Sequence, residues 1–502
     1  MTNINDIIRL IDGVTNDDVM LINKAYSFSQ KAHEGQKRHS GEEYFTHVFE
    51  TAKILSELGM SATTVAAGFL HDTVEDCDVT LGTIEKEFGK EVAFLVDGVT
   101  KLGGLRYNGA DRHNESLRKL FVAVSEDIRV IMIKLSDRLH NMRTLSFVPQ
   151  EKQLRIATET LEIYAPIAYR LGIRKLNREL EDLAFPYVYP KEYENLKKEM
   201  KESERERNES IEKFIRSVKK ALAKEGLVNI KTDYRIKGLY SLYKKLQEKK
   251  DVEKIFDINA VRILVDTPAD CYRVLGVIHA LWRPLPDRIK DYIAFSKPNG
   301  YQGIHTTIFT GDGGIIEVQI KTNDMHRHSE YGVASHISYK KGKAGQDAET
   351  IGWVGSLLPK TEVREIHKST LETSKDIPRW IQELVAYQEN SENGATFREH
   401  LKDDFFSNRI FAFSPKGDVV DLPIGSTPID FAYSIHSDIG NRMMGAKINK
   451  KLVSLDTELQ NGDIIEIMTK SSAKPNQKWI DMCKTSMAKR HIRIELSKIS
   501  KK

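Results

Sequence analysis

The sequence has few cysteines and no long apolar run. Its three cysteines, Cys77, Cys271 and Cys483, are far apart and follow neither a metal-binding nor a disulfide spacing, which favours a reducing cytoplasm. No N-terminal basic segment precedes an apolar core, and no window has the roughly 18 consecutive apolar residues of a membrane-spanning helix. The net charge is only +4, although 29% of the residues are charged, which argues against a protein that coats nucleic acid. We therefore expect a cytoplasmic protein without a membrane partner.

The length of 502 residues exceeds what one hydrophobic core usually organises, so three or more domains are expected. Apolar residues recur at helical spacing through most of the first third of the chain. This periodicity predicts an all-helical domain over residues 1–190. The expected helices are Asp17–His33, Tyr44–Leu58, Ala62–Glu75, Thr80–Phe88, Glu91–Lys101, Arg112–Val124, Ile128–Leu145 and Lys152–Arg170.

Four potential metal ligands lie on these predicted helices: His47, His71, Asp72 and Asp137. Two imidazoles and two carboxylates suit Mn²⁺, Fe²⁺ or Zn²⁺ better than Ca²⁺. A lone His-Asp pair is more often a capped or core pair, but further polar residues accompany this one. Glu75 and Asp76 follow one turn later, where a carboxylate can orient or deprotonate water. Asn141 and Thr144 recur with Asp137 on one helix face, unless they only satisfy nearby backbone.

Residues 191–228 are charged on nearly every side, which predicts a solvated connecting helix. An α/β domain with a mixed sheet is expected over residues 229–345, because strand and helix patterns then alternate. Its expected strands and helices are, in order, Ile230–Ile236, Leu239–Lys249, Ile258–Val265, a helix from Pro268 to Trp282, Ile304–Thr310, Ile315–Ile320 and the helix Met325–Tyr339.

Polar residues that could bind a nucleotide and a divalent metal gather around this predicted sheet. Glu317 and Gln319 share one face of a strand, and Asp257 begins another. Cationic residues cluster at a strand-to-helix junction, where helix N-termini also favour anions. The alternative is that these residues have no binding role and form an exposed hairpin with solvated charges. The remaining candidates are Arg235, Lys237, Lys244, Lys297, Asn299, Tyr301 and His305.

The C-terminal part contains a predicted helical connector over 346–405 and short strands with one helix over 406–470. Residues 471–502 are predicted to begin a further helical segment.

Several runs together resemble the RelA/SpoT homologue family, whose enzymes make and degrade the alarmone (p)ppGpp. These runs are KRHSGEEYFTH, FLHDTVED, DGVTKL, KLSDRLHNMRTL, RIKGLYSLYKK, DINAVR, RIKDY, KPNGYQ, IHTT and EVQIKT. The resemblance implies an HD-type hydrolase domain, a nucleotidyltransferase-like synthetase domain and a small β-grasp-like TGS domain over 406–470. The zinc-finger-like and ACT modules that usually complete long members do not follow in this sequence.

In the hydrolase domain, the resemblance implies that His47, His71, Asp72 and Asp137 hold Mn²⁺. Glu75 and Asp76 would activate water. Arg38, Asn141 and Thr144 would contact the guanosine tetraphosphate.

In the synthetase domain, the resemblance implies that Arg235, Lys237 and Lys244 bind ATP phosphates and that Asp257 binds Mg²⁺. Glu317 would activate the 3′-hydroxyl of GDP or GTP, and Tyr301 would stack on guanine. Lys297, Asn299 and His305 would surround the acceptor nucleotide. The run Arg288–Asp291 matches the RxKD form of bifunctional members. The chain departs from the family at Lys321, where arginine is usual, and at Ser329, where a small apolar residue is usual.

The sequence thus predicts a bifunctional enzyme that transfers pyrophosphate from ATP to GDP or GTP and removes it from ppGpp or pppGpp. Running both reactions at once would only consume ATP, so we expect the two halves to be held in opposed states. One alternative is an enzyme with a single active half. Another is a ribosome- or tRNA-binding regulator that acts through the TGS domain, with His436 as a candidate contact.

Overall fold

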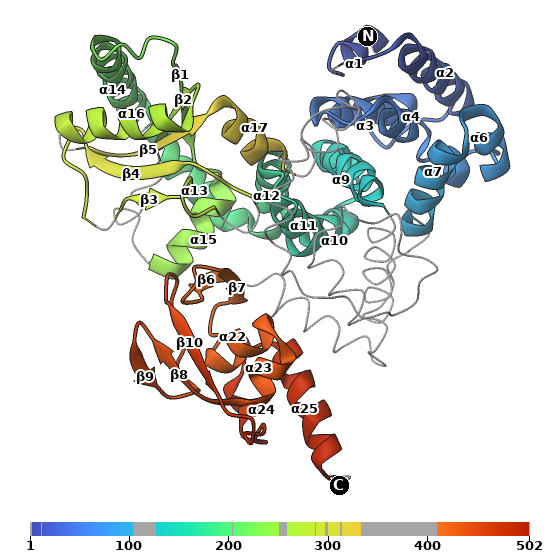
Figure 1. Cartoon of the computed structure of the whole chain (residues 1–502). Coiled ribbons are helices and arrows are strands. Elements are labelled where there is room, and N and C mark those ends of the chain that lie inside the picture. The colour runs from blue at the N-terminus through green and yellow to red at the C-terminus, as the bar shows by residue number, and fades with distance from the viewer. Residues whose placement is uncertain are drawn as a thin grey trace. The chain divides into compact units, whose positions relative to one another are not determined.

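The computed structural model describes residues 3–11, 13–103, 127–202, 204–249, 259–286, 288–296, 300–311, 314–332 and 409–500. These residues form two compact units, one up to residue 332 and one from residue 409 (Figure 1). The predicted helix Arg112–Val124, the end of the predicted helix Met325–Tyr339 and the predicted connector 346–405 lie outside the described residues.

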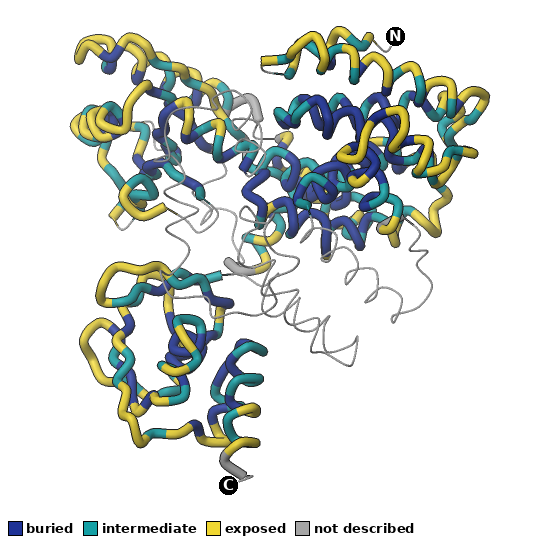
Figure 2. The backbone as a smooth tube through the Cα atoms, turned by 45° about the vertical axis from the view of Figure 1, so that its right-hand side comes forward, coloured by how far each residue is buried: buried dark blue, intermediate teal, exposed yellow. Residues whose placement is uncertain are grey.

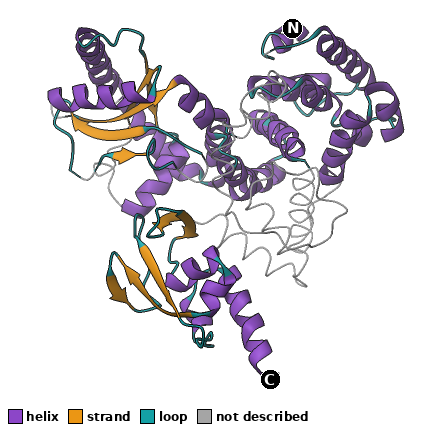
Figure 3. Cartoon of the chain, in the orientation of Figure 1, coloured by secondary structure: helices purple, strands orange, loops and turns teal. Residues whose placement is uncertain are grey.

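The described N-terminal residues are helical, as predicted (Figure 3). Buried residues concentrate in three of these helices, α3, α4 and α9 (Figure 2). The element bounds are α1 Ile4–Ile8, α2 Asn16–Ala32, α3 Phe45–Glu57, α4 Ala62–Leu70, α5 Thr73–Asp76, α6 Leu81–Phe88, α7 Lys90–Gly103, α9 Ile128–Arg143, a 3₁₀ turn at Leu145–Phe147, α10 Gln150–Glu159, a π-helical turn at Thr160–Tyr164, α11 Ala165–Arg170 and α12 Arg174–Val188.

The single helix predicted for Ala62–Glu75 is wrong, because the helix breaks at the His71–Asp72 pair. The Thr73 hydroxyl donates to the Leu70 carbonyl at 2.7 Å. Gly68 lets α4 approach α3 closely, since a Cβ there would collide with the Leu55 side chain. Helix α4 therefore presents His71 at its end, and the short α5 carries Glu75 and Asp76.

A five-stranded mixed sheet follows, with strand order β1-β2-β5-β4-β3. Strands β2 and β5 pair in parallel, and the other neighbours pair antiparallel. This confirms the predicted mixed sheet and adds the short strand β3. The bounds are β1 Lys231–Ile236, α15 Leu239–Lys249, β2 Asn259–Val265, α16 Pro268–Leu281, β3 Lys290–Asp291, β4 Ile304–Phe309, β5 Ile315–Thr322 and α17 Asn323–Tyr331.

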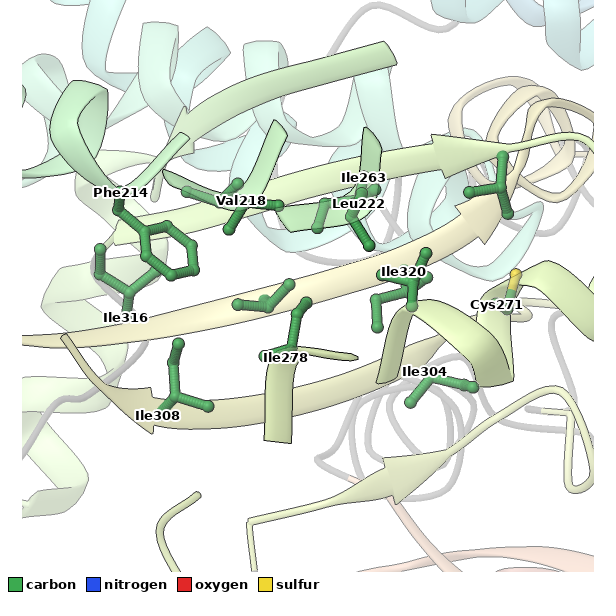
Figure 4. Packing of buried hydrophobic residues seen from close by; sticks show 14 of the residues in the cluster. Phe214, Val218, Leu222, Ile263, Cys271, Ile278, Ile304, Ile308, Ile316 and Ile320 are labelled. Atoms are coloured by element: carbon green, nitrogen blue, oxygen red, sulfur yellow. The ribbon is translucent and has the colours of Figure 1, made fainter. Parts of the chain in front are cut away.

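The prediction of a solvated connecting helix over 191–228 is wrong. The segment contains two helices, α13 Pro190–Glu202 and α14 Glu204–Lys224. Phe214, Val218 and Leu222 of α14 are buried in one core with α16 and strands β2, β4 and β5 (Figure 4). The few apolar residues of α14 recur at helical spacing, so they form one stripe that covers the sheet although the rest of the helix is charged.

The C-terminal unit contains a three-stranded sheet in the order β10-β8-β9 and a pair formed by β6 and β7. Strands and one helix lie where the sequence predicts them. The bounds are β6 Arg409–Phe413, β7 Val419–Pro423, α22 Pro428–Ile435, α23 Ser437–Asn441, β8 Met443–Ile448, β9 Lys451–Val453, β10 Ile465–Thr469, α24 Trp479–Met482 and α25 Ser486–Ser500.

Residues after 470 pack on this unit and do not form a separate segment in the described chain. Trp479 and Ile492 share a core with Ile429 and Tyr433 of α22. The buried Asp430 carboxylate accepts hydrogen bonds from the backbone and hydroxyl of Thr427, from the backbone of Lys484, and from the backbone and hydroxyl of Thr485. Asp430 therefore ties α22 to the start of α25. Across the described residues, no helix is both long and apolar enough to cross a membrane.

Candidate active sites

The four predicted metal ligands of the helical domain converge on one buried point. The Nε2 atom of His47 lies 3.5 Å from Oδ2 of Asp72 and 3.3 Å from Oδ1 of Asp137. The Nε2 atom of His71 lies 3.2 Å from Oδ2 of Asp72. Ligand atoms of His47, His71 and Asp137 all lie within 4.8 Å of one another. Residues from α3, α9 and the break after α4 thus meet, although up to 90 residues separate them in the chain.

The orientation of His71 fits a cation at this point. Its Nδ1 atom lies 2.8 Å from the Gly68 carbonyl, which can only accept, so Nδ1 carries the hydrogen. Its Nε2 atom is buried, makes no hydrogen bond among the described residues and faces the carboxylates. Without a bound cation, burial lowers the pKa of His71, but the adjacent Asp72 carboxylate outweighs it and raises the pKa to about 9, so a cation that binds there displaces the hydrogen from Nε2. Two imidazoles and two carboxylates are a donor set that suits Mn²⁺, Fe²⁺ or Zn²⁺.

Lys134, which was not predicted from the sequence, is a largely buried cation beside this cluster, with 15% of its side chain exposed. Its Nζ atom lies 2.9 Å from Oδ2 of Asp137. Burial alone would raise the pKa of Asp137, but the Lys134 ammonium holds it far below its usual value. Asp137 is therefore ionised, as a metal ligand must be.

The three predicted nucleotide contacts of this domain, Arg38, Asn141 and Thr144, lie together beside the metal ligands. The Arg38 guanidinium donates to the Asn141 side-chain oxygen at 2.5 Å and to the Thr144 hydroxyl at 3.2 Å. The Asn141 amide nitrogen donates to Oδ1 of Asp137 at 2.5 Å. These contacts leave the three predicted binding residues and one metal ligand in a single hydrogen-bonded group.

His140, which was also not predicted as a site residue, completes this group. Its Nδ1 atom lies 2.8 Å from Nδ1 of His47 and 3.1 Å from the Arg38 guanidinium. Burial, followed by the cations around it, lowers the pKa of His140 to about 3. His140 follows Asp137 by three positions on α9, so it shares the face already identified from Asp137 and Asn141. That spacing was the signal available in the sequence.

The two predicted water-activating acids, Glu75 and Asp76, lie on α5 beside the metal ligands. The hydroxyl group of Tyr44 lies 2.8 Å from Oδ2 of both Asp72 and Asp76, so it bridges a metal ligand and a proposed catalytic acid. Desolvation of the carboxylate raises the pKa of Glu75 to about 7. The negative charges of Asp72 and Asp76 act in the same direction, whereas the Lys134 ammonium opposes the rise. Tyr44 was not predicted as a site residue, although it precedes His47 by only three residues.

In the sheet domain, Glu317, His305 and Tyr301 lie side by side. His305 of β4 pairs with Gln319 of β5, and its Nδ1 atom lies 3.3 Å from Oε1 of Glu317. Gln319 also donates to Oε1 of Glu317 at 2.6 Å. The Tyr301 hydroxyl and Nε2 of His305 are hydrogen-bonded. The polar face of the sheet therefore carries the predicted acid and two predicted nucleotide contacts, while its other face forms the core in Figure 4.

The ring of Tyr301 is covered by two cations. The Arg174 guanidinium lies 4.1 Å and the Lys321 ammonium 4.2 Å from the ring centroid, and the residue is only 2% exposed. Lys321 also donates to the Ser329 hydroxyl at 3.1 Å. Two positions at which the chain departs from the family pattern thus contact each other. Burial and the neighbouring guanidiniums hold the pKa of Lys321 well below its usual value.

Two of the predicted ATP-phosphate ligands lie near α12. Lys244 forms a 2.7 Å ion pair with Glu181. Burial, followed by the charge of Arg178, lowers the pKa of Arg235. Lys237 directly follows β1. The predicted residues Asp257, Lys297 and Asn299 lie outside the described residues.

Helix α12 contacts both domains of this unit. Lys175 pairs with Glu57 of α3 at 3.3 Å, and Glu179 pairs with Arg143 of α9 at 2.7 Å. Arg174 and Glu181 contact residues of the sheet domain, as described above, and Asp182 accepts a hydrogen bond from the backbone of Tyr240. One helix therefore touches the supports of both candidate sites.

The fold and the site residues define a class: an all-helical domain with a buried two-histidine, two-aspartate cluster, followed by a mixed-sheet domain with a carboxylate and a histidine on its polar face. Comparison with family models agrees. Residues 25–174 match an HD domain, residues 234–344 match the region found in RelA / SpoT proteins, and residues 410–469 match a TGS domain. The chain belongs to the RelA/SpoT family.

Curated relatives are similar over most of the chain. A GTP pyrophosphokinase of Myxococcus xanthus is 43% identical over 95% of this chain and 60% of its own length. A guanosine-3′,5′-bis(diphosphate) 3′-pyrophosphohydrolase of Aquifex aeolicus is 43% identical over 95% of this chain and 64% of its own. The bifunctional (p)ppGpp synthase/hydrolase SpoT of Escherichia coli is 40% identical over 95% of this chain and 65% of its own. The chain thus spans less than two thirds of the length of these relatives.

Proposed function

We propose that the chain is a bifunctional alarmone enzyme that both synthesises and hydrolyses (p)ppGpp. The main supporting observation is that one chain contains two separate groups of candidate catalytic residues. One is the converged cluster His47, His71, Asp72 and Asp137, and the other lies on the sheet, where Glu317 is beside His305. The relatives named for pyrophosphokinase, pyrophosphohydrolase and both activities support the same assignment.

In the proposed hydrolase, the four converged residues hold a divalent cation, which we propose to be Mn²⁺. When bound, such a cation supplies a Lewis acid for removal of the 3′-pyrophosphate. Glu75 and Asp76 take the proton from the attacking water, and the Tyr44 hydroxyl fixes the direction of the Asp76 carboxylate. Arg38, Asn141 and Thr144 contact the nucleotide. Asp137 and Asp72 stay ionised throughout.

In the proposed synthetase, Glu317 accepts the proton of the ribose 3′-hydroxyl of GDP or GTP, and the oxygen attacks the β-phosphorus of ATP. The bond between the α- and β-phosphates of ATP breaks, and AMP leaves. Arg235, Lys237 and Lys244 neutralise ATP phosphates, with Mg²⁺ on Asp257, so positioning and charge neutralisation carry most of the catalysis. Tyr301 stacks on guanine, with Lys297, Asn299 and His305 around the acceptor.

We further propose that this conformation belongs to the hydrolysing state. The hydrolase residues already contact one another, whereas Arg174 and Lys321 cover the ring on which guanine is to stack. Glu181 also pairs with Lys244, a proposed ATP ligand. Synthesis then requires α12 to release Tyr301 and Lys244, which supports the expectation that the two activities alternate.

The proposed setting is the cytoplasm, which the three free cysteines favour. The TGS domain is proposed to contact the ribosome or tRNA. His436 is a candidate for this contact because more than half of its side chain is exposed, although the ring also accepts a hydrogen bond from the backbone of Asp438.

The direct test is thin-layer separation of labelled nucleotides after incubation with ATP, GDP and Mg²⁺, and separately with ppGpp and Mn²⁺. Asp72→Ala should abolish only ppGpp loss, and Glu317→Ala should abolish only ppGpp formation. Each variant is the control for the other, because each leaves the second site intact.

The outcomes discriminate between the candidate functions. Loss of ppGpp without its formation would favour an enzyme with one active half, which is the alternative that the covered Tyr301 supports. Tight RNA binding with no turnover of either substrate would favour the regulator. Appearance of both reactions, each removed by its own substitution, would establish the bifunctional enzyme.

A further inference from the structure

His47 and His71 achieve their orientation in different ways. A histidine ligates a cation through Nε2 only if that nitrogen has no hydrogen, which requires the hydrogen to be on Nδ1. For His71, the Gly68 carbonyl fixes this arrangement because it can only accept. For His47, the partner of Nδ1 is a second imidazole, His140, at 2.8 Å. An imidazole nitrogen can donate or accept, so this contact alone leaves the tautomer of His47 open.

Arg38 removes that ambiguity. Its guanidinium has five N–H donors and no acceptor, and it lies 3.1 Å from the same Nδ1 atom of His140. The Nδ1 atom of His140 must therefore be an acceptor for Arg38. Because Nδ1 of His140 then carries no hydrogen, its contact with His47 is a hydrogen bond only if Nδ1 of His47 donates and shares the lone pair with Arg38. Nε2 of His47 is then left with a lone pair between Asp72 and Asp137.

The surroundings keep this arrangement in place. His47 and His140 are both buried, with 2% and 6% of their surfaces exposed, so water has little access to either ring. Arg38 is itself fixed by the side chains of Asn141 and Thr144. Arg38 and His47 are therefore both donors, and Nδ1 of His140 is the acceptor for both.

We propose that His140 is a positioning residue of the hydrolase, which Arg38 holds as an acceptor so that His47 presents Nε2 to the cation. The inference rests on the proposed metal site. It gives Arg38 a second role, because a residue expected to contact the nucleotide also selects the tautomer of a metal ligand. Partners of this kind around a ligand histidine typically change metal affinity about 10- to 100-fold.

The test compares two substitutions at one position in the full chain. His140→Gln keeps a side-chain oxygen that can accept from His47, whereas His140→Leu has no acceptor. We expect Mn²⁺ affinity, measured by electron paramagnetic resonance of free Mn²⁺ without nucleotide, to fall about 10- to 100-fold in His140→Leu and to be largely retained in His140→Gln. Circular dichroism and thermal melting of the metal-free proteins show whether both variants fold. A residue that only fills space would not show this order, because the apolar variant packs at least as well.

A second measurement on the unchanged protein keeps the inference testable if the variants fail to fold. Nitrogen-15 spectra of histidine-labelled protein loaded with diamagnetic Zn²⁺ should show the hydrogen of His47 on Nδ1, with the assignment made by its loss in His47→Gln. A hydrogen on Nε2, or equal Mn²⁺ affinity in His140→Leu and the unchanged protein, would overturn the proposal. Absence of Mn²⁺ and Zn²⁺ binding in the unchanged protein would overturn the metal site and this role together. Intact Mn²⁺ binding without turnover would contradict the proposed function alone.

Discussion

The two candidate sites differ in what their residues contact. In the helical domain, the proposed substrate and metal residues contact one another: Arg38 donates to Asn141, and Asn141 donates to Asp137. In the sheet domain, Tyr301, His305 and Glu317 also contact one another, but α12 occupies two of the proposed substrate residues: Tyr301 lies beneath Arg174, and Lys244 pairs with Glu181. The first site is preorganised for its ligands, whereas the second must exchange protein contacts for nucleotide contacts before it can work.

This difference has an energetic meaning. A ligand whose site is already formed gains its full binding free energy, while a ligand that must displace protein groups has a weaker apparent affinity. The structure therefore predicts that substitutions in the helical site mostly remove function, whereas some substitutions on α12 increase it.

The largest effect is expected at Asp137, where the preorganised site depends on a buried ion pair. Asp137→Ala would leave the Lys134 ammonium buried without its partner, which typically lowers the free energy of unfolding by about 3–5 kcal/mol. Hydrogen exchange of peptides from α9 in the metal-free protein should reveal the loss. The double variant Asp137→Ala, Lys134→Met should recover much of it. Unchanged exchange in Asp137→Ala would mean that the helical site is not held together by this pair.

Glu75→Gln should lower the rate of ppGpp hydrolysis about 10²- to 10⁴-fold, the usual range for loss of a general base, and leave synthesis unchanged. Because the pKa of Glu75 is raised to about 7, the carboxylate is mostly protonated below that pH and becomes a base above it. Hydrolysis should therefore rise as the pH increases towards about 7, and a bound cation would move this rise to lower pH. Steady-state rates against pH would measure it. The exposed Glu85 of α6 provides a control, since Glu85→Gln should keep the full profile.

Arg174→Met should favour synthesis and not impair it, because it uncovers one face of Tyr301. A cation over an aromatic ring typically contributes about 0.5–2 kcal/mol, so the KM for GDP in synthesis should fall by about 2- to 30-fold. Hydrolysis of ppGpp should not change. Lys175→Met is the matched control, since the neighbouring Lys175 pairs with Glu57 on the helical side. A higher KM for GDP in Arg174→Met would instead make Arg174 a part of the acceptor site.

The smallest effect is expected for Tyr44→Phe, which removes the hydroxyl between Asp72 and Asp76. One hydrogen bond typically contributes about 0.5–1.5 kcal/mol, so hydrolysis should slow by about 2- to 13-fold. Melting of the metal-free protein should change little, because the ring and its packing remain. Single-turnover hydrolysis is the appropriate measurement. A rate equal to that of the unchanged protein would show that Asp76 needs no support from Tyr44.

Much of the fold could be predicted from periodicity. The helices α2, α3, α6 and α9 and all the predicted strands of the sheet domain lie within a few residues of their expected bounds, because long amphipathic segments and alternating strands carry strong local signals. The break at His71 and the burial of α14 could not be predicted in the same way. Both depend on contacts with other elements, such as Leu55 against Gly68 and the sheet against Phe214.

The site residues, like the fold, could be predicted only where the signal is local. Residues of recognisable type on one helix face, such as Asp137 and Asn141, could be grouped from their spacing. Tyr44, Lys134 and His140 were missed because a tyrosine, a lysine or a histidine on an apolar helix has many structural roles, and only contacts across elements distinguish them. The cover over Tyr301 could not be predicted either, since Arg174 lies more than 120 residues earlier in the sequence.

The parallel pairing of β2 with β5 also constrains how the protein can be made. Ala260 is opposite Glu317 and Val265 is opposite Thr322, so more than 50 residues separate the partners. During translation, β1 and β2 leave the ribosome well before the strand that completes their sheet. Until Thr322 has emerged, one edge of β2 and the apolar stripe of α14 have no partner from β5, and unpaired edges of this kind invite aggregation. A ribosome that stalls between these strands would therefore hold a nascent chain whose helical domain is complete and whose sheet is not.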